Sequence, residues 1–247
     1  MKEVPDAAAP KRLDPSTHRL DRSVDGALND FDTHALEAAL EVKDAAPDTE
    51  VVVVSMGPER AGESLRKALA MGADRVLLAT DAAAAGSDLV ATSAVLAKAL
   101  EREGADLILF GQQAGDSDGA VLWAAVADRL RLPLISQAAS LSLDGGKAKA
   151  KRQTEYGYDV LEASLPAVVA VSDAINEPRY PSLKGIMGAK SKPQEVLAAD
   201  AIGVEAPSAT EVLALQPPPP RAEGKRLEGG TATAVEIVDF LAERRLL

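Results

Sequence analysis

Apolar runs of strand length alternate with helical patterns over the first half of the chain. Apolar residues from Phe31 to Val42 recur at helical spacing, and residues 50–55 (EVVVVS) form a β-branched run typical of a strand buried on both faces. Two more strands are predicted at residues 75–79 and 106–110, and further helices at about 58–72, 87–100 and 120–130. Strands that alternate with helices of this length predict a parallel sheet with right-handed crossovers.

The pattern changes after Pro133, where strands follow one another without helices between them. They are predicted at residues 136–143, 147–154, 159–162 and 167–172. This succession is typical of an antiparallel patch attached to the parallel sheet. The expected fold class is therefore α/β, with a doubly wound, mostly parallel sheet and an antiparallel patch.

The two ends of the chain differ from its middle. Residues 1–6 have the pattern of residues that follow the end of a buried strand. Residues 6–30 predict a loop with a short hairpin. We expect an α/β domain over residues 1–193 and an arm over 194–247, since the composition changes after Pro193.

The expected arm has three parts. Pro217–Pro220 favours an extended spacer, Gly229-Gly230 a hinge, and residues 232–247 a last amphipathic helix. Because so short a helix cannot bury its apolar side alone, we expect it to dock on another subunit.

Ligands of a doubly wound sheet bind beyond the carboxyl ends of its strands. Three segments are expected there: one at a helix start, one after the first strand, and a glycine-rich stretch before a helix. Glycines at four-residue spacing let backbone N–H groups approach an anion, and the helix N-terminus favours negative charge. The candidate residues are Asn29, Asp30, Phe31, Asp32, Met56, Gly111, Gln112, Gln113, Ala114, Gly115, Asp116, Ser117, Asp118, Gly119, Ala120, Val121 and Leu122.

This stretch is open to two interpretations. It is a phosphate cradle or simply a glycine-rich turn between a strand and a helix; it contains neither GxGxxG nor a P-loop Gly-Lys-Ser/Thr. Asp116 and Asp118 could serve as acid–base groups, but carboxylates at a helix start are more often caps, as expected also for Asp30 or Asp32. With two histidines near the N-terminus and no cysteine, no catalytic set is predicted.

Composition narrows the class of protein. The chain is 47% hydrophobic but only 3% aromatic, which predicts a core of Ala, Val and Leu. A net charge of −11 argues against nucleic acid as a partner, and the absence of cysteine excludes disulfides and iron–sulfur clusters. No apolar run approaches the roughly 18–20 residues of a membrane span, and no secretory signal is seen. We expect a soluble, cytoplasmic protein without membrane insertion.

Residues 176–190 (NEPRYPSLKGIMGAK) form a distinctive polar and proline-rich stretch. Pro178 and Pro181 restrict the backbone, and a helix that starts near Ser182 would place Leu183 and Met187 on one face. By spacing alone this stretch either covers the end of a sheet or forms a docking surface.

Several of these segments resemble the beta subunit of electron-transfer flavoprotein. The resemblance runs over nearly the whole chain and is most specific in ALAMGADR (residues 68–75) and in NEPRY (176–180) followed by Leu183 and by IM-x-AK. It implies an adenine-nucleotide alpha-hydrolase-like fold, a structural AMP at the three candidate segments, and FAD held mainly by an alpha subunit.

The resemblance also implies partners. The heterodimer would carry electrons from acyl-CoA and related flavin dehydrogenases, as in fatty acid beta-oxidation, towards a membrane quinone oxidoreductase. The Pro-rich arm and last helix would wrap the alpha subunit, and Leu183 would anchor the recognition loop in a pocket on the dehydrogenase. The recognition residues by this resemblance are Asn176, Glu177, Pro178, Arg179, Tyr180, Leu183, Ile186 and Met187.

The sequence departs from the family pattern at three places. The family's first strand, and a nucleotide contact just before Lys2, are not found, which we attribute to a misassigned start or a shortened chain rather than to a loss of function. Asp30 stands where many members have proline. Gln153 stands where some members have an acidic residue near the alpha subunit, so no ion pair is expected there.

Two alternatives remain. A bifurcating member of the family would bind a second FAD where AMP is expected. A universal-stress-type nucleotide-binding protein would share the sheet but would have a self-contained C-terminus, against which the arm argues. An ATP-hydrolysing pyrophosphatase is excluded, because it needs a catalytic phosphate loop that the sequence lacks.

Overall fold

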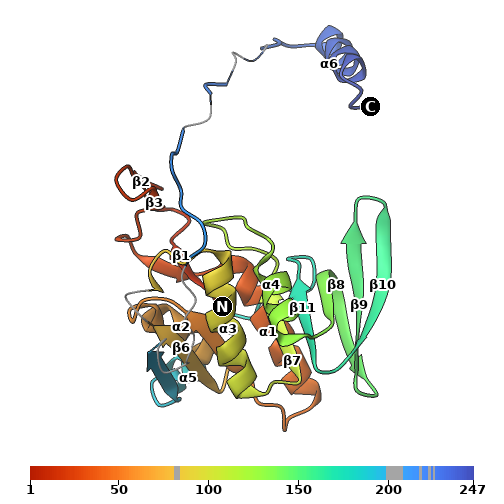
Figure 1. Cartoon of the computed structure of the whole chain (residues 1–247). Helices are drawn as coiled ribbons and strands as arrows, with labels where there is room; N and C mark the ends of the chain where they lie inside the picture. The colour runs from red at the N-terminus through yellow and green to blue at the C-terminus, as the bar shows by residue number, and fades with distance from the viewer. Residues whose placement is uncertain (81–83, 199–207, 217–218, 222–223, 225) are drawn as a thin grey trace. The chain divides into compact units, whose positions relative to one another are not determined.

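The computed structural model describes residues 1–247 apart from 81–83, 199–207, 217–218, 222–223 and 225. The chain divides into two compact units, Met1–Leu213 and Ala214–Leu247 (Figure 1). The first unit holds all of the strands and five of the six helices that the structure describes. It is therefore the unit in which a site can be built from several elements.

Two sheets form the centre of the first unit. A parallel sheet has the order β12-β6-β5, and a mixed sheet has the order β10-β9-β8-β11-β7, in which β7, β11 and β8 are parallel. The strands are β5 (Val52–Met56), β6 (Arg75–Thr80), β7 (Leu107–Gly111), β8 (Leu134–Asp144), β9 (Lys147–Thr154), β10 (Gly157–Ser164), β11 (Ala167–Val171) and β12 (Gln194–Ala198).

Near the N-terminus lie two small antiparallel pairs. They are β1 (Glu3–Pro5) with β4 (Gly26–Leu28), and β2 (Leu13–Asp14) with β3 (Arg19–Leu20). The second pair is the hairpin predicted between residues 6 and 30, whereas the pairing of β1 with β4 was not predicted.

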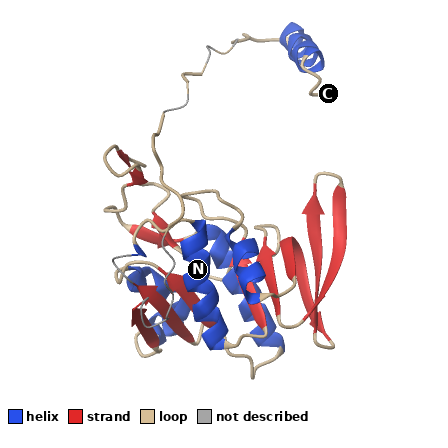
Figure 2. Ribbon diagram, in the orientation of Figure 1, coloured by secondary structure: helices blue, strands red, loops and turns tan. Residues whose placement is uncertain are grey.

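Helices lie on both faces of the parallel strands (Figure 2). Leu36 of α1 and Leu69 of α2 pack with Val53 of β5 on one face, while Leu96 of α3 packs with Val54 on the other. The strands of a doubly wound sheet alternate their side chains between two such helix layers. The helices are α1 (Asp30–Ala45), α2 (Ala61–Met71), α3 (Leu89–Glu103), α4 (Leu122–Leu130), α5 (Leu183–Ala189) and, in the second unit, α6 (Thr231–Glu243).

The predicted α/β class with its antiparallel patch is confirmed, and α3 lies where a helix was predicted at about residues 87–100, with Asp88 as its cap. Two details of the prediction are wrong. The parallel strands do not form one sheet, because β5 pairs with β6 and β7 pairs with β11, but β5 and β7 do not pair with each other. For the same reason Val52 and Val54, expected to be fully buried, are only half-buried.

The structure places the end of the main unit later than residue 193. β12 pairs in parallel with β6 from Gln194 to Ala198, so this part of the expected arm belongs to the sheet. The last helix is present as α6, and Gly229 and Gly230 before it have positive φ values of 54° and 95°. Pro217 and Pro218 of the expected spacer lie outside the described residues.

Candidate functional site

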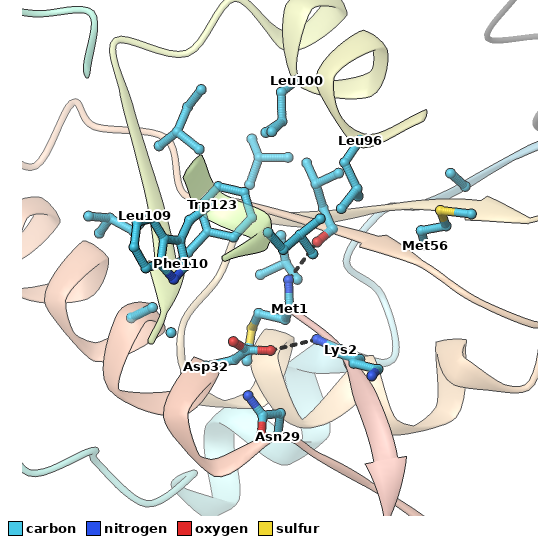
Figure 3. A pocket seen from close by; sticks show the side chains of 18 of the residues that line it. Met1, Lys2, Asn29, Asp32, Met56, Leu96, Leu100, Leu109, Phe110 and Trp123 are labelled. Atoms are coloured by element: carbon cyan, nitrogen blue, oxygen red, sulfur yellow. Dashed lines mark hydrogen bonds between the residues drawn. The ribbon is translucent and has the colours of Figure 1, made fainter. Parts of the chain in front are cut away.

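The three candidate segments meet at one cavity of about 1800 Å³. They are the end of β5 and the loop between β7 and α4, which lie at the carboxyl ends of parallel strands, and the first turn of α1, which follows β4 and packs against the end of β7. Figure 3 shows Asn29 and Asp32 below the cavity and Trp123 above it. The candidates that line the cavity are Asn29, Asp32, Met56, Gly111, Gln112, Gln113, Ala114, Ser117, Gly119, Ala120, Val121 and Leu122. Asp30, Phe31, Gly115, Asp116 and Asp118 are not among its lining residues.

Asn29 organises the glycine-rich loop. Its side chain is 2% exposed; Nδ2 donates to Gln113 O at 2.8 Å, and Oδ1 accepts from Gly115 N at 3.0 Å. Asn29 occupies the N-cap position of α1 without a side-chain cap bond. The expectation that Asp30 or Asp32 caps this helix is therefore wrong: the Asp32 carboxylate accepts a hydrogen bond from Lys2 N at 2.7 Å.

Only one of the three regularly spaced glycines is required by close packing. A Cβ at Gly111 would lie 2.5 Å from the carbonyl carbon of Phe31, so the end of β7 passes directly against the first turn of α1. At Gly115 the nearest atom, Asn29 Oδ1, would be 3.9 Å away, and at Gly119 nothing lies within 4 Å. Close packing therefore does not require glycine at these two positions.

Asp116 is an ion-paired carboxylate rather than a helix cap. Its side chain is 2% exposed and forms ion pairs with Lys2 (2.8 Å) and Arg22. Burial raises the pKa of Asp116, but the hydrogen bonds and positive charges of Lys2 and Arg22 outweigh this and hold the pKa below its ordinary value. Asp116 therefore ties the loop to the N-terminal segment as a carboxylate. Asp118 accepts a hydrogen bond from Gln113 Nε2 at 3.1 Å.

The loop leads into a helix start that suits an anion. α4 begins at Leu122, and Val121 at its N-cap provides no side-chain cap, so backbone N–H groups at the helix start remain available. The indole Nε1 of Trp123 donates to Gln112 O at 2.9 Å, which holds the ring at the cavity wall. Sequence reasoning missed Trp123, Lys2 and Arg22, because their roles arise from contacts across the fold.

Residues 176–181 run along α1 and are fastened to it. Asn176 Nδ2 donates to the carbonyl oxygen of His34 at 3.1 Å, and Arg179 donates to both carboxylate oxygens of Glu37 at 2.8–3.0 Å. Glu37 is 5% exposed, whereas the side chain of Asp44, which pairs with the same arginine at 2.8 Å, is 63% exposed. The hydrogen bonds to Glu37 and Asp44 raise the pKa of Arg179.

The short helix α5 presents apolar side chains from a fixed position. Ser182 caps the helix by accepting a hydrogen bond from Gly185 N at 3.0 Å, as predicted. A Cβ at Gly185 would lie 2.2 Å from Ala70 O, so α5 lies directly on α2. The exposed members of the recognition segment are Glu177, Tyr180 (91%), Leu183 (82%), Ile186 (49%) and Met187 (76%), while Asn176, Pro178 and Arg179 are half-buried. The exposure of Leu183 and Met187 fits the docking interpretation.

The described residues contain no cluster of three or more side chains that could hold a metal ion. No helix in the described part of the chain is long and apolar enough to cross a membrane. The fold and cavity define an α/β protein with a cavity at the carboxyl ends of its strands, where proteins of this architecture bind their ligands, and with a separate apolar surface on α5.

Comparison with known proteins gives the family. The electron transfer flavoprotein domain profile matches residues 17–202. The chain is 38% identical over 259 residues to the electron transfer flavoprotein subunit beta of Mycobacterium bovis, covering 100% of this chain and 97% of that protein. It is 39% identical over 257 residues to the caffeyl-CoA reductase-Etf complex subunit CarD of Acetobacterium woodii, with the same coverage. The chain belongs to the electron transfer flavoprotein beta-subunit family and is an electron carrier subunit.

Replacing Asp116 by Asn tests the ion-paired carboxylate. At pH 7 we expect D116N to lose about 2 kcal/mol of unfolding free energy, because Lys2 and Arg22 lose their buried partner. The pKa of Asp116 in the folded protein lies below the ordinary value of 3.8. The carboxylate therefore contributes fully to the unfolding free energy above pH 3.8, and this contribution is lost as the pH falls through the folded-state pKa. Urea unfolding at pH 7 and at pH 3 measures the difference in unfolding free energy between D116N and the unaltered protein. This difference should be smaller at pH 3. D118N is the control, with little change at either pH.

Replacing Glu37 and Asp44 compares two partners of the same arginine. We expect E37Q to lower the free energy of unfolding by about 2 kcal/mol, since Glu37 is buried. D44N should lower it by less than about 1 kcal/mol, since Asp44 is exposed. Chemical denaturation of both variants provides the measurement. Equal losses of unfolding free energy in the two variants would show that burial of the ion pair does not determine its contribution to stability.

Proposed function

We propose that this chain forms a heterodimer with an electron-transfer flavoprotein alpha subunit and carries electrons from flavin dehydrogenases, such as acyl-CoA dehydrogenases, towards a quinone oxidoreductase. The alpha subunit holds most of the FAD, and this chain holds AMP and recognises the dehydrogenase. The observation that carries the proposal is the exposed apolar surface of α5, fixed on α2 beside a segment clamped to α1.

The shape of the cavity supports AMP. One glycine-rich loop and one uncapped helix start provide donors at the end of β7, which suits a single phosphate group. Trp123 and Met56 give the cavity apolar walls that suit a nucleoside. The similarity to a subunit of the caffeyl-CoA reductase-Etf complex keeps a second FAD as the alternative occupant, in a bifurcating member of the family.

The surface on α5 supports dehydrogenase docking. Leu183 projects from the first turn of a helix whose backbone is fixed by Ser182 and Gly185. An apolar side chain held in place before binding loses little conformational freedom when it enters a pocket. This arrangement suits Leu183 as the anchor, with Tyr180 and Met187 around it.

The second unit supports the alpha subunit as partner. On α6, the apolar side chains of Val235, Ile237, Val238 and Phe240 are 43–59% exposed. A helix with apolar side chains left exposed gains stability when another protein covers them. We assign this cover to the alpha subunit.

The nucleotide is tested by extraction. The purified heterodimer is denatured, and the released compounds are separated and counted per heterodimer. We expect one AMP and one FAD. Two FAD and no AMP would contradict the AMP assignment and favour the bifurcating form.

Docking is tested by Leu183→Ala. We expect unchanged FAD and AMP content but about a tenfold rise in the heterodimer concentration needed for half-maximal reduction by an acyl-CoA dehydrogenase, since a buried leucine side chain contributes about 1.5–3 kcal/mol. The matched control is Leu13→Ala, which removes a 59% exposed leucine from the β2–β3 hairpin. If both variants were reduced like the unaltered heterodimer, Leu183 would not be the anchor.

A further inference from the structure

Residues 208–212, called the arm root below, attach the C-terminal part of the chain to the first unit. They belong to this unit, which ends at Leu213, and the chain continues from there into the second unit. The arm root is exposed and contains no helix or strand. Its attachment therefore depends on individual hydrogen bonds and not on sheet pairing or on a buried core.

Asp88 makes most of these hydrogen bonds. Its Oδ2 accepts from Ala209 N at 2.7 Å, from Thr210 N at 3.0 Å and from Thr210 Oγ1 at 3.1 Å. In return, the backbone N–H of Asp88 donates to Ser208 Oγ at 2.9 Å. Three successive residues of the arm root are thus bound to one residue that lies 120–122 positions earlier in the chain.

The same carboxylate also caps α3. Its Oδ1 accepts a hydrogen bond from Ala91 N at 2.9 Å. The hydrogen bonds from Ala91, Ala209 and Thr210 hold the pKa of Asp88 below its ordinary value, with the bond from Ala91 as the largest cause. Hydrogen bonds to an ionised acceptor are stronger than those to a neutral one. The two oxygens therefore have separate roles, Oδ1 towards the helix and Oδ2 towards the arm root.

The β2–β3 hairpin provides a second point of attachment. His18 Nδ1 donates to Val212 O at 2.8 Å. Arg19 of the same hairpin donates to Ala85 O at 3.1 Å, and its guanidinium lies so close to Gly86 that no Cβ would fit there. The hairpin, the loop before α3 and the arm root therefore hold one another in place, although they lie far apart in the sequence.

The attachment shortens the part of the chain that connects α6 to the first unit. The last strand of the sheet ends at Ala198, and α6 begins at Thr231. With Val212 held, about 18 residues precede α6, whereas about 32 would do so if Ala198 were the last fixed point. The effective concentration of a tethered unit falls roughly as the −3/2 power of the tether length, so the shorter tether raises it about twofold.

We propose that Asp88 is a positioning residue for assembly: through Oδ2 it fixes the arm root and so keeps the second unit within reach of the alpha subunit. This inference rests on the proposed function, in which the alpha subunit covers the apolar side chains of α6. When both units of the chain bind one alpha subunit, the second binding event is intramolecular, and a shorter tether favours it.

The variant Asp88→Asn separates the two roles of the carboxylate. Asparagine is as good an N-cap as aspartate, so α3 keeps its cap. The Nδ2 amide that replaces Oδ2 is a donor and cannot accept hydrogen bonds from Ala209 and Thr210. The matched control is Asp128→Asn, which makes the same change of charge at an exposed position of α4.

We expect D88N to speed hydrogen exchange at the amides of Ala209 and Thr210 about tenfold and to change the melting temperature by no more than about 3 °C. The Kd for the alpha subunit, measured by titration, should rise about twofold. D128N should change neither the exchange nor the Kd.

A double-variant cycle shows whether this rise in Kd acts through the tether. Val238→Asp places a charge among the exposed apolar side chains of α6 and should raise the Kd about tenfold or more. Because the tether matters only while α6 binds, D88N should add nothing further in the V238D background. A general loss of stability in D88N would add to the effect of V238D instead.

Three results would overturn the proposal. Unchanged exchange at Ala209 and Thr210 in D88N would show that Oδ2 does not hold the arm root. Faster exchange with an unchanged Kd, while V238D weakens binding, would show that the attachment has no role in assembly. An unchanged Kd in V238D would contradict the assignment of α6 to the alpha subunit, and the role of Asp88 with it, whatever the exchange in D88N. The last two results distinguish a failure of this inference from a failure of the proposed function.

Discussion

Helix α1 is the element on which both functional surfaces depend. At its start, Asn29 holds the glycine-rich loop by two hydrogen bonds, and Phe31 packs so closely on Gly111 that only glycine fits. Along its length, buried Glu37 holds Arg179 and so fixes the segment that leads to α5. One rigid helix thus sets the position of the cavity relative to the apolar surface on α5. A carrier that must bring its cofactor to a fixed place on a partner needs such a constraint.

Local patterns predicted most of the fold. The β-branched run of β5 and the helical spacing of α1 are signals within short stretches, and the convergence of three segments at one cavity follows from the rule that parallel strands end at the same edge. The helix start near Ser182 could likewise be expected from spacing, whereas spacing left the exposure of Leu183 open.

Features that arise from long-range contacts could not be predicted. Asp116 has the sequence context of a helix cap, and only the fold shows that Lys2 and Arg22 neutralise it. Asn29 was expected near the site, but its hydrogen bonds to the loop depend on the packing of β7 against α1. β12 lies in a stretch with little apolar content, and its place in the sheet is fixed by pairing with β6.

The N-terminal residues link the sheet to the glycine-rich loop beside the cavity. Met1 and Lys2 lie between them: Met1 contacts β5, and Lys2 ties the N-terminal segment to the glycine-rich loop through Asp116. The surface on α5 rests on α2 instead.

The central claim is that this subunit recognises its electron donor through α5. Hydrogen exchange of the heterodimer, with and without an acyl-CoA dehydrogenase, tests it most directly. The account predicts that the donor slows exchange over residues 180–190 and leaves the β2–β3 hairpin unchanged. Unchanged exchange over 180–190 under conditions in which the dehydrogenase reduces the heterodimer would contradict it.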